Sequence, residues 1–572
     1  MNRTIRITLI AAAGLVLALA LAVAAALVFI DPNDFKPKIE SMVLEATGKP
    51  LSLEGKLSLS LFPNLSVTAG PAELRDGESF GPDPFARVEA FSAAVALTPL
   101  FSGKAEIDSV SISGLRLKLA VDKDGKANWS MPEKSDEKTP DTPRDAGAKP
   151  ASPNLADLAL DSFAIHDAAV VYMDMRSGES MRLSVPKFTL DSLRAGQKTT
   201  LNLEAVYAGS LPEPVKLGMR AGFVIPRSID QGLTFDTEGT LDTTPFSFKG
   251  TVALPQTSET QLISLKGEAA VGDIDADKYI PAGKQGKAAS SPDKKAGKAR
   301  ETGSDESVRQ FLNEFILDLY ITVKSVTVAK VPFANITAGI KADQGVLTVK
   351  PVTMTLAEGP VTIEATLDAR EKDIRGRLTG DWKRARIGSF LHAALGKTPA
   401  TGELDASWSL NATGTAPTTA MATLNGKLAA NLTNGTIPGF ALIPPGTSNL
   451  PAKIMDLTNV RASGTWDVAK GIARNNDLLV SAAGLKASGS GQINIPAQTL
   501  QYAITVDLPT LPELPHLTVL PVVISGPLSS PSYGIDQPKL LRDTAKSLID
   551  PGSKTGRELN KIGGALGRML TR

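Results

Sequence analysis

Two groups of aspartates stand at spacings that resemble a cation-binding loop. Asp122-Lys123-Asp124-Gly125 looks like the start of a calcium loop, but the later ligand positions hold Lys126 and Asn128. Asp273-Ile274-Asp275-Ala276-Asp277 has Lys278 where such a loop requires glycine. An Asp-Gly pair between two alternating strands is typical of a hairpin turn. We therefore predict that both groups are structural and that the chain has no metal site.

Other catalytic patterns are incomplete in this sequence. Gly396-Lys397-Thr398 resembles the end of a phosphate loop, yet Leu391 occupies the position of the required first glycine. We predict no nucleophile elbow, and no H-E-x-x-H zinc helix occurs. The three histidines, His166, His392 and His516, lie far apart and in unlike contexts. The prediction is a protein without catalytic residues or cofactor. The alternative that stays open is a catalytic pair of carboxylates from distant parts of the sequence.

Composition excludes further classes of function. Lys and Arg (61) nearly balance Asp and Glu (60), leaving a formal charge of +1. A nucleic-acid-binding protein needs a basic surface for its phosphate contacts, so we expect no nucleic-acid partner. The chain has no cysteine, which removes disulfides, thiolate metal ligands and a cysteine nucleophile. Sheet pairing and apolar burial must therefore hold the fold together.

Alternation of apolar and polar residues predicts many strands. Strict alternation with a period of two indicates a strand with one dry and one wet face. Gly114 stands where the alternation changes phase, which suggests a bulge or a turn. The clearest alternating segments are 110–121, 201–207, 215–225, 246–254, 352–356, 361–367 and 502–508. Turn residues separate them, so the prediction is a mainly β fold with a long antiparallel sheet.

An apolar stretch precedes the strands. Residues 7–30 carry no charge, and a helix of this length would measure about 36 Å, enough to cross a hydrocarbon core of about 30 Å. A cleaved signal peptide is the alternative, but its apolar core is usually only about 7–15 residues long. Arg3 and Arg6 precede the stretch, which favours a cytoplasmic N-terminus. We predict a single-pass anchor, with everything after it exported.

Two segments rich in Pro, Ala, Lys, Ser and Gly interrupt the strand pattern. They cannot bury enough apolar surface to offset the entropy of ordering, so we predict disordered linkers. The predicted organisation is a cytoplasmic stub (1–6), an anchor (7–30), an N-terminal β region with a leading helix (31–132), a linker (133–153), a middle β region (154–280), a linker (281–304), a C-terminal β region (305–535) and an amphipathic helical tail (536–572).

Helical spacing predicts a few short helices. One runs from Asp34 to Gly48, a second follows Asp305 and includes Phe315 and Leu319, and a third ends at Gly396. In the tail, Leu559, Ile562, Leu566 and Met569 share one side, and basic residues occupy the other. The tail is either an ordinary end helix packed on the sheet or a helix that contacts an anionic lipid surface or a partner.

Several segments resemble the AsmA family of Gram-negative envelope proteins. They extend along nearly the whole chain except the two linkers. Each segment alone is a weak match, but their order along the chain is fairly specific. The segments are DPNDFKP (31–37), TGKPLSLEG (47–55), SLFP (60–63), LTPLFSG (97–103), DGKANW (124–129), DADKYIP (275–281), LNG (424–426) with NGTIPG (434–439), and LPVVISGPLSSP (520–531).

The resemblance implies an inner-membrane anchor and a periplasmic body formed by a long, curled, open sheet with an apolar groove. In the family that groove is thought to hold acyl chains and to support outer-membrane biogenesis and lipid homeostasis. The expected partners are phospholipid or another acyl-chain lipid, the inner membrane and outer-membrane assembly proteins. The alternative is a scaffold for outer-membrane protein assembly with a filled core. The candidate groove residues are Leu203, Leu217, Met219, Phe223, Phe248, Ile363 and Ile504.

Overall fold

The computed structural model describes residues 31–60, 64–96, 107–129, 159–227, 232–253, 262–280, 297–443, 453–482, 484–508, 519–540 and 542. The chain forms two compact units. Unit 1 comprises Met1–Ala253 and Lys278–Gln285, and unit 2 comprises Leu254–Asp277 and Gly286–Arg572. Both are mainly β, so the predicted fold class is confirmed to that extent. The sheet is open, and the predicted curl into a groove is not confirmed.

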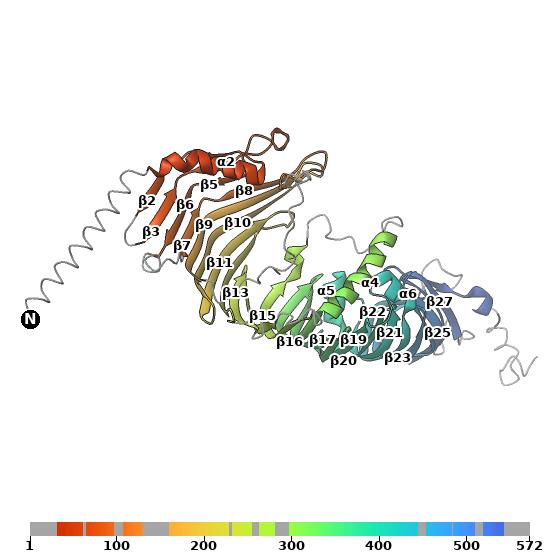
Figure 1. Ribbon diagram of the computed structural model, residues 1–572. Helices are drawn as coiled ribbons and strands as arrows, with labels where there is room; N and C mark the ends of the chain where they lie inside the picture. The colour runs from red at the N-terminus through yellow and green to blue at the C-terminus, as the bar shows by residue number, and fades with distance from the viewer. Residues whose placement is uncertain are drawn as a thin grey trace, which may run out of the picture. The chain divides into compact units, whose positions relative to one another are not determined.

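Unit 1 begins with the 3-10 helix η1 (Pro32–Phe35) and helix α2 (Lys36–Thr47), and it contains a second 3-10 turn, η2 (Glu78–Phe80). Its strands are β1 (Leu51–Leu53), β2 (Leu57–Ser60), β3 (Leu65–Ala69), β4 (Ala72–Leu74), β5 (Ala86–Val88), β6 (Ala90–Val95), β7 (Ile107–Ser113), β8 (Arg116–Val121), β9 (Ala159–Asp174), β10 (Glu179–Arg194), β11 (Lys198–Ala208), β12 (Val215–Val224), β13 (Leu233–Leu241) and β14 (Thr244–Ala253). Figure 1 shows them side by side from red to yellow.

The first eight strands are four long strands, each interrupted near its middle. β1 pairs with β4 and β2 with β3, and the same arrangement joins β4 to β5, β3 to β6, β5 to β8 and β6 to β7. Gly55 and Gly70 face each other at one interruption, where a Cβ on Gly55 would lie 2.3 Å from Gly70 Cα. Gly114 has φ +64° at another, in agreement with the predicted irregularity. Residues without a side chain therefore allow the sheet to bend along one line.

Strand β9 joins this bent part to the rest of unit 1. β7 and β8 both pair with it in parallel, one along each half of its length. From β9 to β14 the strands form an antiparallel meander. β7 and β8, from the predicted region 31–132, thus pair directly with β9, from the predicted region 154–280.

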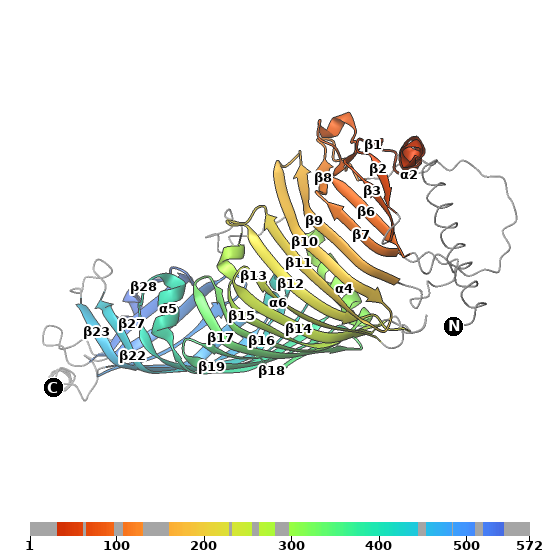
Figure 2. The same cartoon turned by 90° about the vertical axis from the view of Figure 1, so that its left-hand side faces the viewer.

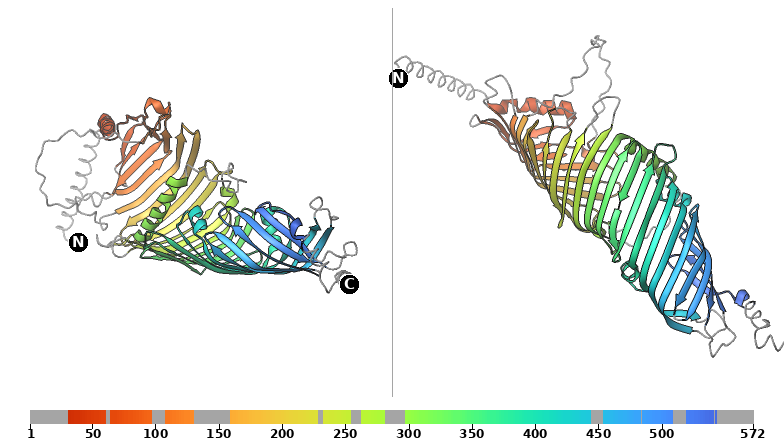
Figure 3. Two further views of the ribbon diagram at one scale, coloured as in Figure 1. Left: turned by 90° about the vertical axis from the view of Figure 1, so that its right-hand side faces the viewer. Right: turned by 90° about the horizontal axis from the view of Figure 1, so that it is seen from below.

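Unit 2 contains β15 (Ile263–Asp275), η5 (Ala276–Tyr279, whose last two residues belong to unit 1), α4 (Gly297–Glu314), β16 (Phe315–Val328), β17 (Val331–Asp343), β18 (Val346–Leu356), β19 (Gly359–Asp368), β20 (Arg375–Arg386), α5 (Ile387–Leu395), β21 (Thr401–Thr413), α6 (Pro417–Thr423), β22 (Asn425–Ile443), β23 (Lys453–Ala469), β24 (Ile472–Ala482), β25 (Leu485–Asn494), β26 (Thr499–Asp507), β27 (Val519–Pro527) and β28 (Ser532–Ile535). Figure 3 shows the strands from green to blue.

Within unit 2, β15 and β16 are parallel, and every later pair up to β28 is antiparallel. The predicted wholly antiparallel sheet is therefore wrong at this pair and at the two parallel pairings of β9. A parallel pair requires a crossover connection, and α4 lies in that connection. Tight turns join many of the later strands. At Ala329-Lys330 and Ala357-Glu358 both turn residues have positive φ, as in the type I′ hairpins that match the twist of a sheet.

Three predictions about helices and linkers can be compared directly. α2 and α5 end at Gly48 and Gly396, both in the left-handed conformation, as predicted. α4 ends at Glu314, so the prediction that Phe315 and Leu319 are helical is wrong, because both lie in β16. The helix also begins at Gly297, inside the predicted linker 281–304.

Other predictions fall outside the residues that the structure describes. These are the anchor at 7–30, the linker at 133–153 and the tail residues Leu559, Ile562, Leu566 and Met569. None of the helices in the described part of the chain combines the length and apolar character that crossing a bilayer requires.

Candidate functional site

The register of unit 1 sorts its side chains into one apolar and one polar face. Directly paired residues of neighbouring strands project to the same side of a sheet, so a row of partners defines one face. One row runs across eight strands and is apolar throughout: Phe91, Ile112, Ile165, Phe188, Leu203, Met219, Gly239 and Phe246. We call this side the apolar face of unit 1.

The adjacent row lies on the opposite side and is mainly polar: Ser92, Ser111, Ala164, Thr189, Asn202, Arg220, Glu238 and Ser247. An ion pair on this polar face links Lys198 Nζ to Asp236 Oδ1 at 3.2 Å. Polar side chains and an exposed ion pair identify this side as the wet side of the sheet, as the alternation predicts.

All five candidate residues in unit 1 lie on the apolar face. Leu203 pairs with Met219, Leu217 with Ala205, and Phe223 with Phe235, and Phe248 contacts Phe235 at a ring-centroid distance of 4.9 Å. Each of the five is half-buried. Figure 2 shows the strands that carry them, β11 to β14.

In the described residues, the apolar face of unit 1 carries no cluster of buried side chains, although Leu57 and Ala205 on it are buried singly. Both clusters of buried hydrophobic side chains found in the described residues belong to unit 2. On the apolar face, Val67 is 40% exposed and Phe91 is 38% exposed. A sheet with one apolar side normally hides that side against another layer. Within the described part of unit 1, the protein's own side chains do not form that second layer.

Unit 2 has an equivalent apolar face. One row of directly paired residues crosses thirteen strands without a polar side chain: Gly267, Leu319, Ile340, Val349, Ala365, Leu378, Leu410, Gly426, Val468, Ala473, Ile493, Leu500 and Gly526. The neighbouring row on the other side begins Lys266, Asp318, Lys341 and Thr348, so unit 2 also separates apolar from polar residues.

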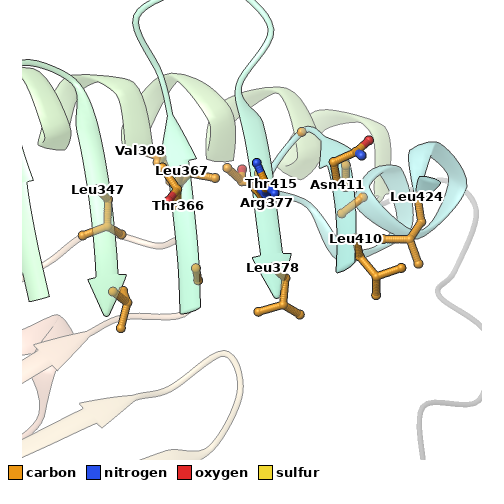
Figure 4. A pocket seen from close by; sticks show the side chains of 16 residues that line it. Val308, Leu347, Thr366, Leu367, Arg377, Leu378, Leu410, Asn411, Thr415 and Leu424 are labelled. Carbon is orange, nitrogen blue, oxygen red and sulfur yellow. The ribbon is translucent and has the colours of Figure 1, made fainter. Parts of the chain in front are cut away.

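A cavity of 430 Å³ opens on the apolar face of unit 2 (Figure 4). Four leucines from the consecutive strands β18 to β21 line it, together with Val308 of α4, Leu424 after α6, and the polar residues Arg377, Asn411 and Thr415; the leucines are Leu347, Leu367, Leu378 and Leu410. Leu378 is 39% exposed. Ligand pockets typically measure about 300–1,000 Å³ and are lined mainly by apolar side chains with a few polar groups. This cavity has the size and chemistry of a site for a hydrocarbon chain.

Side chains of unit 2 cover other parts of its apolar face. Beside the cavity, Leu312 of α4 packs with Ala342, Ala369 and Ile374 and is 1% exposed. A second cluster lies on β23 to β27 and contains Leu457, Val460, Ala482, Leu485, Val506, Leu508 and Leu520. The candidate Ile504 packs against that second cluster, whereas Ile363 lies half-buried opposite Gly380. The apolar face of unit 2 is thus partly open and partly sealed.

Helix α4 is held over the cavity by polar contacts as well as by Leu312. Asp305 accepts a hydrogen bond from the Thr415 backbone N–H at 2.8 Å and another from the Thr415 hydroxyl. Arg309 donates to the Lys372 carbonyl oxygen. These contacts join α4 to the turns at the ends of β19 and β21, and they place Val308 in the cavity wall.

The aspartate-rich loops form turns. In the first, Asp122 Oδ1 accepts the backbone N–H groups of Asp124 and Lys126 at 3.0 and 2.8 Å, and Gly125 has φ +87°. In the second, Asp277 accepts the backbone N–H groups of Ala329 and Lys330. The structural interpretation of both loops is confirmed. In the described residues, no group of three or more potential ligands is placed to hold a metal ion.

The structure does not bring the histidines together. His166 lies in β9 of unit 1, His392 lies in α5 of unit 2, and His516 is outside the described residues. His392 lines a second cavity of 580 Å³ beside α5, whose lining residues include Arg386 and Glu403. Arg386 also pairs with Glu358 at 2.8 Å.

Two carboxyl groups with lowered pKa values share one local arrangement. Arg176 donates its guanidinium and its backbone N–H to Asp174, which holds the pKa of that carboxyl at about 2. Arg370 does the same for Asp368, whose pKa is also about 2. Both Asp-x-Arg sequences stand where a strand ends, so the charged carboxylates stabilise turns and hold no proton that they could donate at neutral pH.

This arrangement predicts a pH effect. Because the folded-state pKa of Asp368 lies below the ordinary value of 3.8, its carboxylate stabilises the fold above that value. This stabilisation should disappear as pH falls from about 4 to about 2. We expect the difference in unfolding free energy between the wild type and Asp368→Asn to be constant above pH 5 and to shrink in that window, as measured by urea unfolding. In Arg370→Gln, NMR titration should show the Asp368 pKa returning toward 3.8; an unchanged pKa would disprove the role of the guanidinium.

The fold and the site define a class: a mainly β protein whose open sheets separate one apolar from one polar face. A family model described as "AsmA family" matches residues 1–206 and 235–471. The chain therefore belongs to the AsmA family, which implies an envelope protein linked to outer-membrane assembly.

One curated relative can be compared in sequence. Over 106 residues the chain is 29% identical to "Protein AsmA" of Escherichia coli (strain K12). The aligned segment covers 18% of this chain and 17% of that protein, so the chain spans about a sixth of the curated relative in this match. No solved structure matches the chain.

Proposed function

We propose that the protein binds phospholipid or another acyl-chain lipid on its apolar sheet faces and thereby supports outer-membrane biogenesis and lipid homeostasis. Residues 7–30 anchor it in the inner membrane with a cytoplasmic N-terminus, and the body lies in the periplasm. The open apolar face of unit 1, on which the described residues form no buried cluster, is the observation that carries this proposal. The apolar cavity within unit 2 supports the same function.

Hydrocarbon supplies the layer that the sheet lacks. Each methylene that leaves water on this surface contributes about 0.8 kcal/mol, so even a short length of acyl chain compensates for the loss of its freedom. No bond is made or broken in such binding. The protein therefore acts without catalytic residues, cofactor or metal, and outer-membrane assembly proteins are its expected partners.

A specific observation favours a second candidate function. The clusters around Leu312 and Leu520 seal parts of the apolar face in unit 2 with the protein's own side chains. A face sealed along its whole length would take up no lipid. The protein would then be a scaffold that assists the assembly or targeting of outer-membrane proteins.

The proposal is tested by measuring the lipid that the purified full-length protein retains after exchange into a lipid-free amphipol. Leu203→Asp places a charge on the apolar face of unit 1, and Asn202→Asp places the same side chain on the polar face next to it. Loss of contact with about two methylenes, at about 0.8 kcal/mol each, corresponds to roughly tenfold weaker binding. We expect mass spectrometry to find much less phospholipid per protein in Leu203→Asp than in Asn202→Asp.

The circular dichroism spectrum of both variants should equal that of the wild type, which shows that loading and folding are separate. Equal lipid loading in the two variants would contradict binding at this face. Absence of lipid from the wild type as well would favour the scaffold.

A further inference from the structure

Helix α2 turns polar side chains toward the sheet. Asn33, just before it, accepts the Leu57 backbone N–H at 2.9 Å and donates to the Leu57 carbonyl at 3.2 Å. Glu40 accepts the Leu53 N–H at 2.9 Å, and Lys36 donates to the Leu53 carbonyl at 3.3 Å. These side chains form hydrogen bonds with the backbone N–H and C=O groups at the outer edge of β1 and β2, as a neighbouring strand would. Figure 2 shows α2 beside this edge.

Most apolar side chains of α2 and that of its N-cap residue Phe35 point away from the sheet, whereas Val43 is half-buried. Phe35 is 51% exposed, Ile39 37% and Met42 59%, and Ala46 is exposed as well. The spacing of 4, 3 and 4 residues puts these four on one side of a helix. We call them the α2 stripe. A helix packed only on its own sheet would show the opposite pattern, with apolar residues inside and polar residues outside.

The position of the α2 stripe in the chain indicates what covers it. The 24 uncharged residues 7–30 end one residue before η1. If they are anchored in a bilayer, α2 starts only six residues after the apolar stretch and therefore close to the membrane surface. Lys38 is exposed and lies beside the stripe in the helix, where an ammonium group can reach the headgroups while its methylenes stay in the apolar zone.

We propose that the α2 stripe lies in the interfacial region of the lipid bilayer and holds the β1–β2 edge of unit 1 at the membrane. This inference rests on the anchor in the proposed function, but not on lipid uptake by the sheet. It places the beginning of the apolar face, where Leu57 pairs with Ala69 and Leu59 with Val67, next to the source of acyl chains.

The absence of cysteine allows a site-specific test with the full-length chain. Single cysteines are introduced as Met42→Cys in the α2 stripe, Ser41→Cys on the neighbouring solvent side and Ala18→Cys in the anchor. Each is labelled with the fluorophore nitrobenzoxadiazole and reconstituted in nanodiscs of phosphatidylethanolamine and phosphatidylglycerol. Quenching is then measured with nitroxide-bearing lipids in the bilayer and with iodide in the water.

We expect the label at position 42 to be quenched by shallow nitroxides at a depth of about 5–10 Å and protected from iodide. The label at position 41 should show the reverse. If the position-42 label is as open to iodide as the position-41 label and nitroxides do not quench it, the inference is overturned. If it is protected from both quenchers and self-quenches, a second copy covers the stripe instead, which also overturns the inference.

The Ala18→Cys label separates this inference from the proposed function. If nitroxides do not quench the position-18 label, the anchor is disproved and the inference with it. If the position-18 label lies in the bilayer but the position-42 label lies in water, only the inference is disproved. Lipid loading of the sheet, measured with Leu203→Asp, is independent of all three labels.

Discussion

Shortening Leu520 to alanine is expected to lower the free energy of unfolding of unit 2 by about 2–5 kcal/mol. Leu520 is 0% exposed and belongs to the buried cluster on β23 to β27, next to its strand partner Val506. Truncation removes the transfer free energy of the side chain and leaves a cavity that the neighbouring strands can close only in part. Three of the four tryptophans, Trp382, Trp408 and Trp466, lie in unit 2, so tryptophan fluorescence during urea unfolding reports on this unit.

Leu479→Ala is the matched control. Leu479 lies in β24 of the same unit but is 59% exposed. Its truncation should change the unfolding free energy by no more than about 0.5 kcal/mol, as is usual for exposed positions. Equal losses for the two variants would mean that the cluster around Leu520 is not a sealed core. The scaffold alternative would then lose the observation that favours it.

The strands and their faces could be predicted from the sequence because the period of a strand fixes both at once. Alternation at 215–225 and 246–254 predicted β12 and β14 nearly to the residue. It also put Leu203 and Met219 on one face, which the register confirms. Where a helix meets a strand the periods compete. Leu319 follows Phe315 by four positions, a spacing that fits both a helix and a strand. The alternation of Leu317, Leu319 and Ile321 fits only a strand, and these residues lie in β16.

Pairing between distant segments could not be predicted in the same way. Nothing in the composition near Ala253 marks the boundary between the units, because both sides of it are alternating strands. The parallel pair β15–β16 forms only after a connection of about forty residues has folded back, and such a contact leaves no local periodic signal.

Whether an apolar side chain is covered depends on the same long-range contacts. Alternation predicted Ile504 and Leu203 as equivalent, but Ile504 packs against a buried cluster and Leu203 does not. The polar contacts of α2 were also missed. Helical spacing at 34–48 does not indicate what Asn33 and Glu40 contact, and only the position of the β1–β2 edge shows that they bind its backbone.

Adding a methyl group at Gly380 is expected to destabilise unit 2 by about 1–3 kcal/mol, the usual cost of overpacking. Gly380 lies in β20 on the apolar face, between Ile363 and Trp408. A Cβ at this position would lie 2.4 Å from the Thr362 carbonyl oxygen and 2.6 Å from the Trp408 ring. Since the oxygen belongs to the backbone of the paired strand, a side-chain rotation cannot relieve the contact, and β19 and β20 must separate.

Gly534→Ala tests whether this cost comes from the close approach or from the loss of any glycine. Nothing lies within 4 Å of a Cβ at Gly534 in β28, and alanine restricts the unfolded chain, so this variant should be unchanged or more stable by up to about 1 kcal/mol. Both free energies come from the same fluorescence-monitored urea unfolding. If Gly380→Ala is as stable as Gly534→Ala, β19 and β20 do not approach each other at Gly380 as closely as the 2.4 Å contact with the Thr362 oxygen requires.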